Sequence, residues 1–106
     1  MAWQSTYKYA RISARKARLI VDLIRGRDVQ DALNILKFTH NRAAGMISKT
    51  LKSAVANAQE AEADVESLIV HEARIDEGPV MKRFQPKDRG RAHPILKRTS
   101  HIVVSV

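Results

Sequence analysis

The sequence predicts an α+β fold, with three helices packed on a small three-stranded antiparallel sheet and a long extended β-hairpin. Apolar residues recur at helical spacing between residues 14 and 61, whereas nearer the two ends of the chain they alternate or are β-branched, as in strands. The predicted order is a strand, three helices and two more strands, with the hairpin between the last two. A length of 106 residues fits a single domain, 1–106, in which residues 78–98 form the hairpin.

The first strand and the first helix follow each other directly. Residues 5–12 alternate in such a way that Tyr7 and Tyr9 share one face of a strand. Ser13 is a predicted N-cap, and Gly26 is a natural stop just beyond the helix. Between them, one apolar stripe falls at i, i+3, i+4 and i+7: Ala17, Ile20, Val21 and Ile24.

Two more helices are predicted before the middle of the chain ends. Asp28 is a candidate N-cap of the second helix, whose apolar positions are Val29, Ala32, Leu33 and Leu36. Residues 38–41 interrupt the pattern. The third helix is expected from about Asn41 to Ala61, with the stripe Ala43, Met46 or Ile47, Leu51, Val55 and Ala58.

The C-terminal part has the patterns of strands. Residues 67–76 alternate, and residues 100–106 are strongly β-branched. The charged stretch between them has turn residues in its middle, which predicts a hairpin arm about 25 Å long at ~3.3 Å per residue. A two-stranded ribbon is marginally stable alone, and this one has few apolar residues, so we expect a partner outside the domain to hold it.

Composition narrows the class of protein. The absence of cysteine excludes a disulfide scaffold, a thiolate metal site and a cysteine nucleophile. No apolar run has the roughly 18 residues of a membrane span, and the first residues do not resemble a signal peptide, so we expect a soluble protein of a reducing compartment. A net charge of +8 indicates a polyanionic partner; nucleic acid is favoured, and an anionic membrane surface is the rival.

The charge is unevenly distributed. Residues 1–27 carry seven basic and one acidic side chain, and residues 78–106 carry the same numbers. Residues 58–77 carry one basic and seven acidic side chains. We therefore expect the acidic middle to face solvent or another protein, and a solvated loop is the favoured interpretation of its first four acids: Glu60, Glu62, Asp64 and Glu66.

Basic residues gather at the start of the first helix. Arg15, Lys16 and Arg18 lie where the helix dipole favours acids, at a cost of about 0.3–1 kcal/mol each if exposed. Phosphate binding, with help from Lys8 and Arg11, would offset that cost; the alternative is a basic surface kept for solubility.

The hairpin is the second basic element. Its arginines have the fork geometry that binds phosphate and stacks on bases, Gly90 permits close backbone approach, and Phe84 is either a base-stacking or a packing residue. The alternative is a disordered basic loop. The four histidines lack metal-ligand spacing, and the chain has no phosphate-cradling glycine loop or nucleophile motif, so we predict no catalytic residues, no metal and no cofactor.

Several segments resemble the bacterial large-ribosomal-subunit protein L-twenty-two family along essentially the whole chain. The residues that carry the resemblance are SARKARL at 13–19, DLIRG at 22–26, SAVANA at 53–58, DEGPVMKR at 76–83, GRA at 90–92 and ILKRTSHI at 95–102, with Pro86 between the last segments. Two residues depart from the usual family pattern: Asp88 at the tip and Phe84, where an aliphatic residue is common.

The resemblance implies a structural constituent of the cytoplasmic ribosome that acts as a monomer, binds large-subunit 23S-type rRNA and aids subunit assembly. Its implied partners are rRNA, neighbouring ribosomal proteins and the nascent peptide, with no membrane. The hairpin would line the peptide exit tunnel, near the macrolide site, with these residues: Met81, Lys82, Arg83, Phe84, Gln85, Pro86, Lys87, Asp88, Arg89, Gly90 and Arg91. Charge and resemblance together predict the rRNA contacts: Lys8, Arg11, Arg15, Lys16, Arg18, Arg25, Lys49, Lys52, Lys82, Arg83, Lys87, Arg89, Gly90, Arg91, Lys97 and Arg98.

Two other functions fit parts of the sequence. A DNA-bending architectural protein also uses basic β arms, and Pro86 is placed to act as an intercalating wedge. A peripheral membrane protein would use the first helix as a basic amphipathic anchor.

Overall fold

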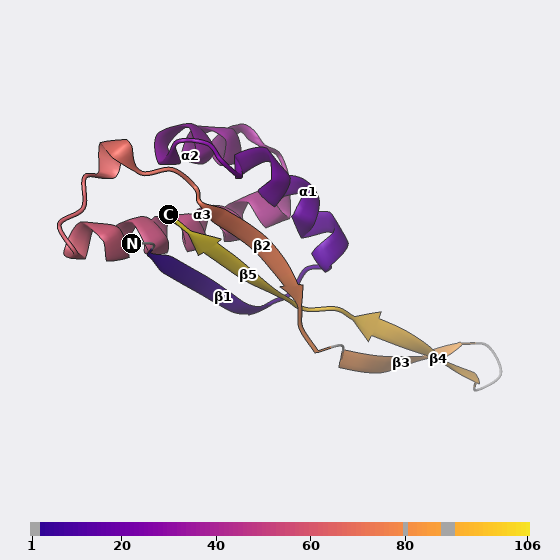
Figure 1. Ribbon diagram of the computed structural model, residues 1–106. Coiled ribbons are helices and arrows are strands. Elements are labelled where there is room, and N and C mark those ends of the chain that lie inside the picture. The colour runs from indigo at the N-terminus through magenta and orange to yellow at the C-terminus, as the bar shows by residue number, and fades with distance from the viewer. Residues whose placement is uncertain (1–2, 80, 88–90) are drawn as a thin grey trace.

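The computed structural model describes residues 3–79, 81–87 and 91–106, and only the backbone of residues 81–87 and 91–97. The elements follow the predicted order and confirm the α+β fold class (Figure 1). They are β1 (Gln4–Ala10), α1 (Ala14–Ile24), α2 (Val29–Phe38), α3 (Arg42–Glu60), the short 3-10 helix η1 (Val65–Ser67), β2 (Glu72–Glu77), β3 (Met81–Lys87), β4 (Arg91–Lys97) and β5 (Ser100–Ser105).

The sheet of the body has the strand order β1-β5-β2, with both pairs antiparallel. The C-terminal strand is therefore central, with Tyr7 on one side of Ile102 and Ile75 on the other. Strands β3 and β4 form a separate two-stranded sheet that projects from the body, so the molecule is 62 Å long and only 25 Å across its next axis (Figure 1).

All three helices lie on one face of the body sheet (Figure 1). Helix α1 packs against β2, α3 packs against β1 and β5, and α2 packs on the other two helices. The core between these layers contains the largest fully buried apolar side chains: Val21, Ile24, Ile47, Leu51, Val70, Ile102 and Val104.

The predicted helical stripes are largely confirmed by burial. All four stripe residues of α1 are buried, and Gly26 follows the helix with φ +80°, a conformation that glycine adopts without steric cost. In α2, Leu33 is only half-buried. In α3, Ile47 is the fully buried member of the pair Met46 and Ile47. Val55 is only half-buried, and its neighbour Ala54 is fully buried in its place.

The prediction that Tyr7 and Tyr9 share a face of one strand is wrong. The pairing of β1 with β5 shifts between Tyr7 and Ala10, and Tyr9 has φ 58°. This bulge breaks the period of two, so Tyr7 packs against the core while Tyr9 is 60% exposed. The Tyr9 amide donates instead to Nδ1 of His101 at 3.1 Å. The strand ends at Ala10, two residues before its predicted end.

The strand predicted over 67–76 is also shorter than expected. Residues 65–67 form η1, and the next residues bond to the start of α2: the amides of Val29 and Val70 donate to Leu68 and Arg27 at 3.2 and 2.8 Å. Strand β2 begins only at Glu72. The acidic link before it faces solvent as predicted, because Glu60, Glu62, Asp64 and Glu66 are all exposed.

The buried stripe of α3 gives a stability prediction. Replacing the fully buried Leu51 with alanine leaves a cavity under the sheet, so we expect Leu51→Ala to lower the free energy of unfolding by about 2–5 kcal/mol. Urea denaturation measures the change, and the exposed neighbour Lys52, changed to alanine, is the control, with an expected effect below about 0.5 kcal/mol. Equal effects at the two positions would contradict this packing.

Candidate nucleic-acid interface

The root of the hairpin brings together segments that are far apart in the sequence. The chain leaves the body after Glu77 and returns at Ser100, and these two residues face each other in the β2–β5 pairing. On the other side, Ser100 pairs with Ala10 of β1, four residues before α1 begins. The start of α1 and the base of the projecting hairpin therefore lie at the same end of the sheet (Figure 1).

Two buried hydroxyl groups fasten this junction, which we call the root clamp (Gly78, Pro79, Thr99, Ser100 and Ile12). The Thr99 hydroxyl donates to the Pro79 carbonyl at 2.6 Å, and the Gly78 amide donates to the Thr99 carbonyl at 3.0 Å. The Ser100 hydroxyl donates to the Ile12 carbonyl at 2.6 Å. The clamp thus ties both ends of the hairpin to each other and to the loop before α1.

Glycine is required at the clamp because the two chains approach closely. A β-carbon at position 78 would lie 2.6 Å from the Thr99 hydroxyl oxygen and 3.3 Å from the Thr99 backbone. The backbone cannot move away without loss of the hydrogen bond from Gly78 to Thr99. The glycine of the DEGP segment is therefore explained by packing at the hairpin root.

Two hollows flank the start of α1 and together form the root recess. One has a volume of about 330 Å³ and the other about 720 Å³, and both are lined by Ser13 and Arg98. The first is also lined by Ala14, Arg15, Arg18, Glu77, Gly78 and Thr99. The second is also lined by Arg11, Ile12, Lys16, Asn41 and Arg42.

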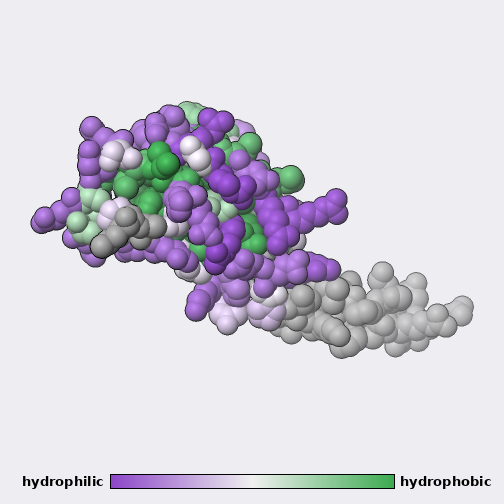
Figure 2. Space-filling view, in the orientation of Figure 1, coloured by the Kyte–Doolittle hydropathy of each residue, from purple (hydrophilic) through white to green (hydrophobic). Residues whose placement is uncertain are grey.

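The root recess is strongly cationic. Glu77 is the single acid among its lining residues, which include six cations: Arg11, Arg15, Lys16, Arg18, Arg42 and Arg98. In Figure 2 the part of the body that adjoins the hairpin is predominantly hydrophilic. The first turn of α1 contains no acid, so the partial positive charge of the helix terminus adds to that of the side chains.

The predicted side-chain cap of α1 is absent. Ser13 occupies the N-cap position, but its hydroxyl makes no capping hydrogen bond. Asp28 likewise starts α2 without a side-chain cap, whereas the Asn41 side chain accepts from the Ala43 amide at 2.9 Å. The N–H groups in the first turn of α1 are thus left to solvent or to a ligand in the recess.

Arg42 is a recess residue that was not among the cations predicted to bind rRNA. It begins α3, about 30 positions after Arg11 and more than 50 before Arg98, yet all three line the same hollow. No local pattern distinguishes it from other exposed cations of the helices. Only the packing of α3 beside the start of α1 reveals its place.

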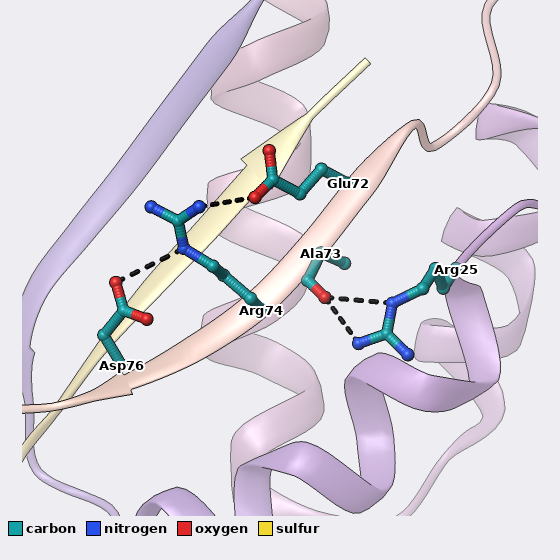
Figure 3. A network of polar contacts seen from close by, with 5 residues as sticks. All are labelled: Arg25, Glu72, Ala73, Arg74 and Asp76. Carbon is teal, nitrogen blue, oxygen red and sulfur yellow. Dashed lines mark hydrogen bonds and ion pairs between the residues drawn. The ribbon is translucent and has the colours of Figure 1, made fainter.

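Two of the predicted RNA-binding arginines have partners within the protein. Arg25 donates to the Ala73 carbonyl through Nε at 3.2 Å and Nη2 at 2.6 Å (Figure 3), and to Asp22 at 2.8 Å. Arg18 donates to the Ile75 carbonyl at 3.1 Å. Both arginines therefore bind the outer edge of β2, and only Arg18 also lines the root recess.

The open face of β2 has its own charge network. The Arg74 side chain donates to Glu72 and, at 3.3 Å, to Asp76 (Figure 3). The hydrogen bond to Glu72, followed by the negative charge of Asp76, raises the pKa of the Arg74 guanidinium above its ordinary value. Two acids and one cation leave this face slightly negative, unlike the recess.

The remaining predicted contacts fall into two groups. Lys49 and Lys52 lie on the outer surface of α3, where the Lys49 ammonium is 5.7 Å from the centre of the Tyr7 ring, and Lys8 is exposed on β1. In the hairpin, Arg83 pairs with Ile95 and Lys87 with Arg91. The predicted rRNA contacts Arg89 and Gly90 and the predicted tunnel-lining residue Asp88 lie outside the described residues.

Other kinds of site are not seen in the described part of the chain. Residues 3–79 and 98–106 contain no group of three or more His, Asp or Glu placed to hold a metal ion. None of the helices described is both long and apolar enough to cross a bilayer.

The fold and the root recess define a small basic α+β protein with a cationic recess at the base of a projecting hairpin. Residues 5–106 match the family of ribosomal protein L22p/L17e. The chain is 55% identical over 104 residues to the large ribosomal subunit protein uL22 of Magnetococcus marinus. The matched region covers 97% of this chain and 92% of that protein. It is 57% identical over 104 residues to the protein of the same name from Ligilactobacillus salivarius. That match covers 97% of this chain and 90% of the Ligilactobacillus salivarius protein. The chain belongs to the ribosomal protein L22p/L17e family.

The root clamp leads to a second stability prediction, with two glycines as a matched pair. Gly78→Ala forces the added methyl group into Thr99, so we expect a loss of about 1–3 kcal/mol. Gly45→Ala, within α3 and with open space around the new β-carbon, should instead stabilise by about 0.5–1 kcal/mol. Chemical denaturation of both variants tests the pair, and a neutral effect of Gly78→Ala would refute the close approach.

Proposed function

We propose that this chain is a structural constituent of the large ribosomal subunit in the cytoplasm, and that it binds large-subunit rRNA through the root recess and the hairpin. The observation that carries the proposal is the recess itself, in which six cations from four separate segments surround the start of α1. Membership of a ribosomal protein family favours RNA over the DNA duplex and the membrane surface as the polyanion.

The recess suits an RNA backbone that lies across the hairpin root. Arginine forks bind phosphate in a bidentate manner, and unsatisfied helix N–H groups attract anions. Arg98 borders both hollows, so one strand of RNA that follows the surface passes it while contacting Arg15 on one side and Arg42 on the other. Phosphate contacts of this kind position the protein without reading the sequence.

The register of the hairpin supports a division between two faces. One set of alternate positions holds four cations, Arg83, Lys87, Arg91 and Lys97, and the other set holds one cation, Lys82, together with Phe84, Pro86, Ala92, Pro94 and Leu96. Alternate positions of a paired ribbon share a face, so one face of the ribbon is basic and the other largely apolar. We assign the basic face to rRNA, where its charges meet phosphates.

The other face of the hairpin is then available to the peptide exit tunnel and the nascent chain. This role rests on the family resemblance together with the length of the projection, since the hairpin accounts for the 62 Å long axis of the molecule. The family resemblance also supports a role in subunit assembly, in which an arm embedded in rRNA would hold distant RNA segments together.

Salt dependence tests the RNA-binding surface. Binding to deproteinised large-subunit rRNA should weaken steeply with salt, because each phosphate contact contributes about 0.7–0.9 to the slope of log K against log salt concentration. Arg42→Gln combined with Arg98→Gln should lower that slope by about 1–2, measured by filter binding. Arg27→Gln, beyond the opposite end of α1, is the control, and an equal change of slope there would count against the recess.

The tunnel role is tested with the two phenylalanines of the chain. A photoreactive phenylalanine analogue at Phe84 of the hairpin should crosslink a stalled nascent peptide in assembled large subunits. The same analogue at Phe38, which is exposed at the end of α2 on the body, is the matched control and should not reach the peptide. Crosslinks from both positions, or from neither, would argue against a hairpin in the tunnel.

A further inference from the structure

We propose that the free edge of β1 binds an extended acidic segment of a partner protein, which adds to the body sheet as a fourth strand beside α3. The inference does not depend on the root recess, and it gives Lys49 and Lys52 a role other than rRNA contact. Four observations support it: the direction of the backbone groups of β1, the number of bonded outward carbonyls at each sheet edge, a hollow beside the β1 edge, and the charge around that edge.

The register determines which backbone groups of β1 are free. Trp3 and Val106 exchange two hydrogen bonds of 2.9 Å, so they form a hydrogen-bonded pair of the ladder. Hydrogen-bonded pairs alternate in an antiparallel ladder, so Ser5 and Tyr7 also point their backbone groups at β5. The N–H and C=O groups of Gln4 and Thr6 therefore point away from the sheet, up to the bulge at Tyr9.

The two edges of the body sheet differ in how many of their outward carbonyls are bonded. On β2, the outward carbonyl of Ala73 accepts hydrogen bonds from Arg25 (Figure 3), and that of Ile75 accepts one from Arg18. On β1, the Asn57 side chain donates to the Gln4 carbonyl at 3.2 Å, and among the described residues nothing bonds to the backbone of Thr6. An exposed edge of this kind is a template for a further strand.

A hollow lies alongside this free edge. It has a volume of about 260 Å³ between β1 and α3 and is lined by Ser5, Thr6, Tyr7, Lys49, Thr50 and Ser53. A second hollow, lined in part by Lys49, Lys52 and Ser53, continues it along α3. Four of its six lining residues carry small hydroxyl side chains, and the Lys49 ammonium lies 5.7 Å from the centre of the Tyr7 ring.

The charge of the groove favours an acidic occupant. No acid occurs between residues 3 and 21 or between residues 42 and 59, which include β1 and nearly all of α3. Lys8, Lys49 and Lys52 are all exposed around the edge. A strand with acidic side chains at alternate positions would present carboxylates to the α3 lysines while its backbone pairs with β1.

Backbone chemistry favours a peptide over RNA at this position. An open strand edge offers both donors and acceptors in alternation, and another strand satisfies both kinds. Phosphate oxygens can accept from the Thr6 amide but cannot donate to its carbonyl, and the one donor of the RNA backbone, the ribose 2′-hydroxyl, does not alternate with acceptors at the spacing of a strand. The edge therefore fits a β-strand better than a ribose-phosphate backbone.

A designed pair of peptides tests the proposal on the full chain. The probe is the capped heptapeptide Thr-Glu-Val-Glu-Val-Glu-Thr, and its counterpart has lysine in place of every glutamate. Hydrogen exchange followed by nuclear magnetic resonance should show the Thr6 amide at least tenfold more protected with the saturating acidic probe, while Ser5 and Tyr7 are already protected without it. The lysine peptide should bind at least tenfold more weakly.

Variants of the protein and the probe separate the contributions. Lys49→Glu with Lys52→Glu should reverse the preference between the two peptides, whereas Lys37→Glu on α2 is the matched control and should not. Thr6→Pro removes the outward N–H while keeping the bonds to β5, and should abolish binding. Should Thr6→Pro prevent folding, an acidic probe methylated on alternate backbone nitrogens blocks the same pairing from the other side and should not bind.

Four outcomes would overturn the proposal. These are equal binding of the acidic and lysine peptides, unchanged binding of the N-methylated probe, protection of Thr6 that rises with protein concentration alone, and stronger protection by a twelve-nucleotide single-stranded RNA. The third would mean that a second copy of the chain occupies the edge, and the fourth that RNA does. The Arg42→Gln and Arg98→Gln variant should bind the peptide normally, so a failure here and a failure of the rRNA proposal are distinguishable.

Discussion

Each residue of β5 hydrogen-bonds to one neighbouring strand only, even-numbered residues to β1 and odd-numbered residues to β2. Because β5 pairs with β1 on one side and with β2 on the other, this pairing determines how the molecule is arranged. It places the C-terminal strand at the centre of the sheet, aims Ile102 and Val104 at the helices, and makes β2 and β5 adjacent. The segment between them must then leave and re-enter at one end of the sheet. Because β1 ends at that same end, the start of α1 lies beside the hairpin root.

The sequence was a good guide where one local pattern outweighs everything else. The stripe of α1 is buried as the spacing predicts, because a helix with one apolar face has a single way to lie on a sheet. It was a poor guide at the bulge. There the Tyr9 amide donates to the His101 side chain and not to a strand carbonyl, and His101 is 92 positions away in the sequence. The sequence also failed for residues 68–70, which alternate like a strand but pair with the turn before α2.

The candidate site was predictable in kind but not in composition. Counting charges identifies two basic ends of the chain, yet it treats all exposed cations alike. In the structure these cations differ in whether other groups of the protein already bond to them. Arg25 is bonded to a strand carbonyl and to Asp22, Arg74 lies between two acids, and Arg98 borders both hollows of the recess. Such differences arise from tertiary packing, so no reading of the sequence alone separates a binding cation from a structural one.

The two edges of the body sheet show why the difference between structural cations and free cations matters for function. Arg18 and Arg25 are seven residues apart, about two helical turns, so they lie on the same face of α1 and its C-cap. From this one face their long side chains reach two outward carbonyls of β2, those of Ile75 and Ala73. Beside β1, the cations are lysines of α3, and within the described residues neither lysine bonds to the strand backbone and the carbonyl of Thr6 stays unbonded. A planar guanidinium closes an edge, whereas a flexible ammonium next to an unpaired edge leaves it open and marks it as attractive to carboxylates. The same positive charge thus has opposite consequences on the two sides of one small sheet.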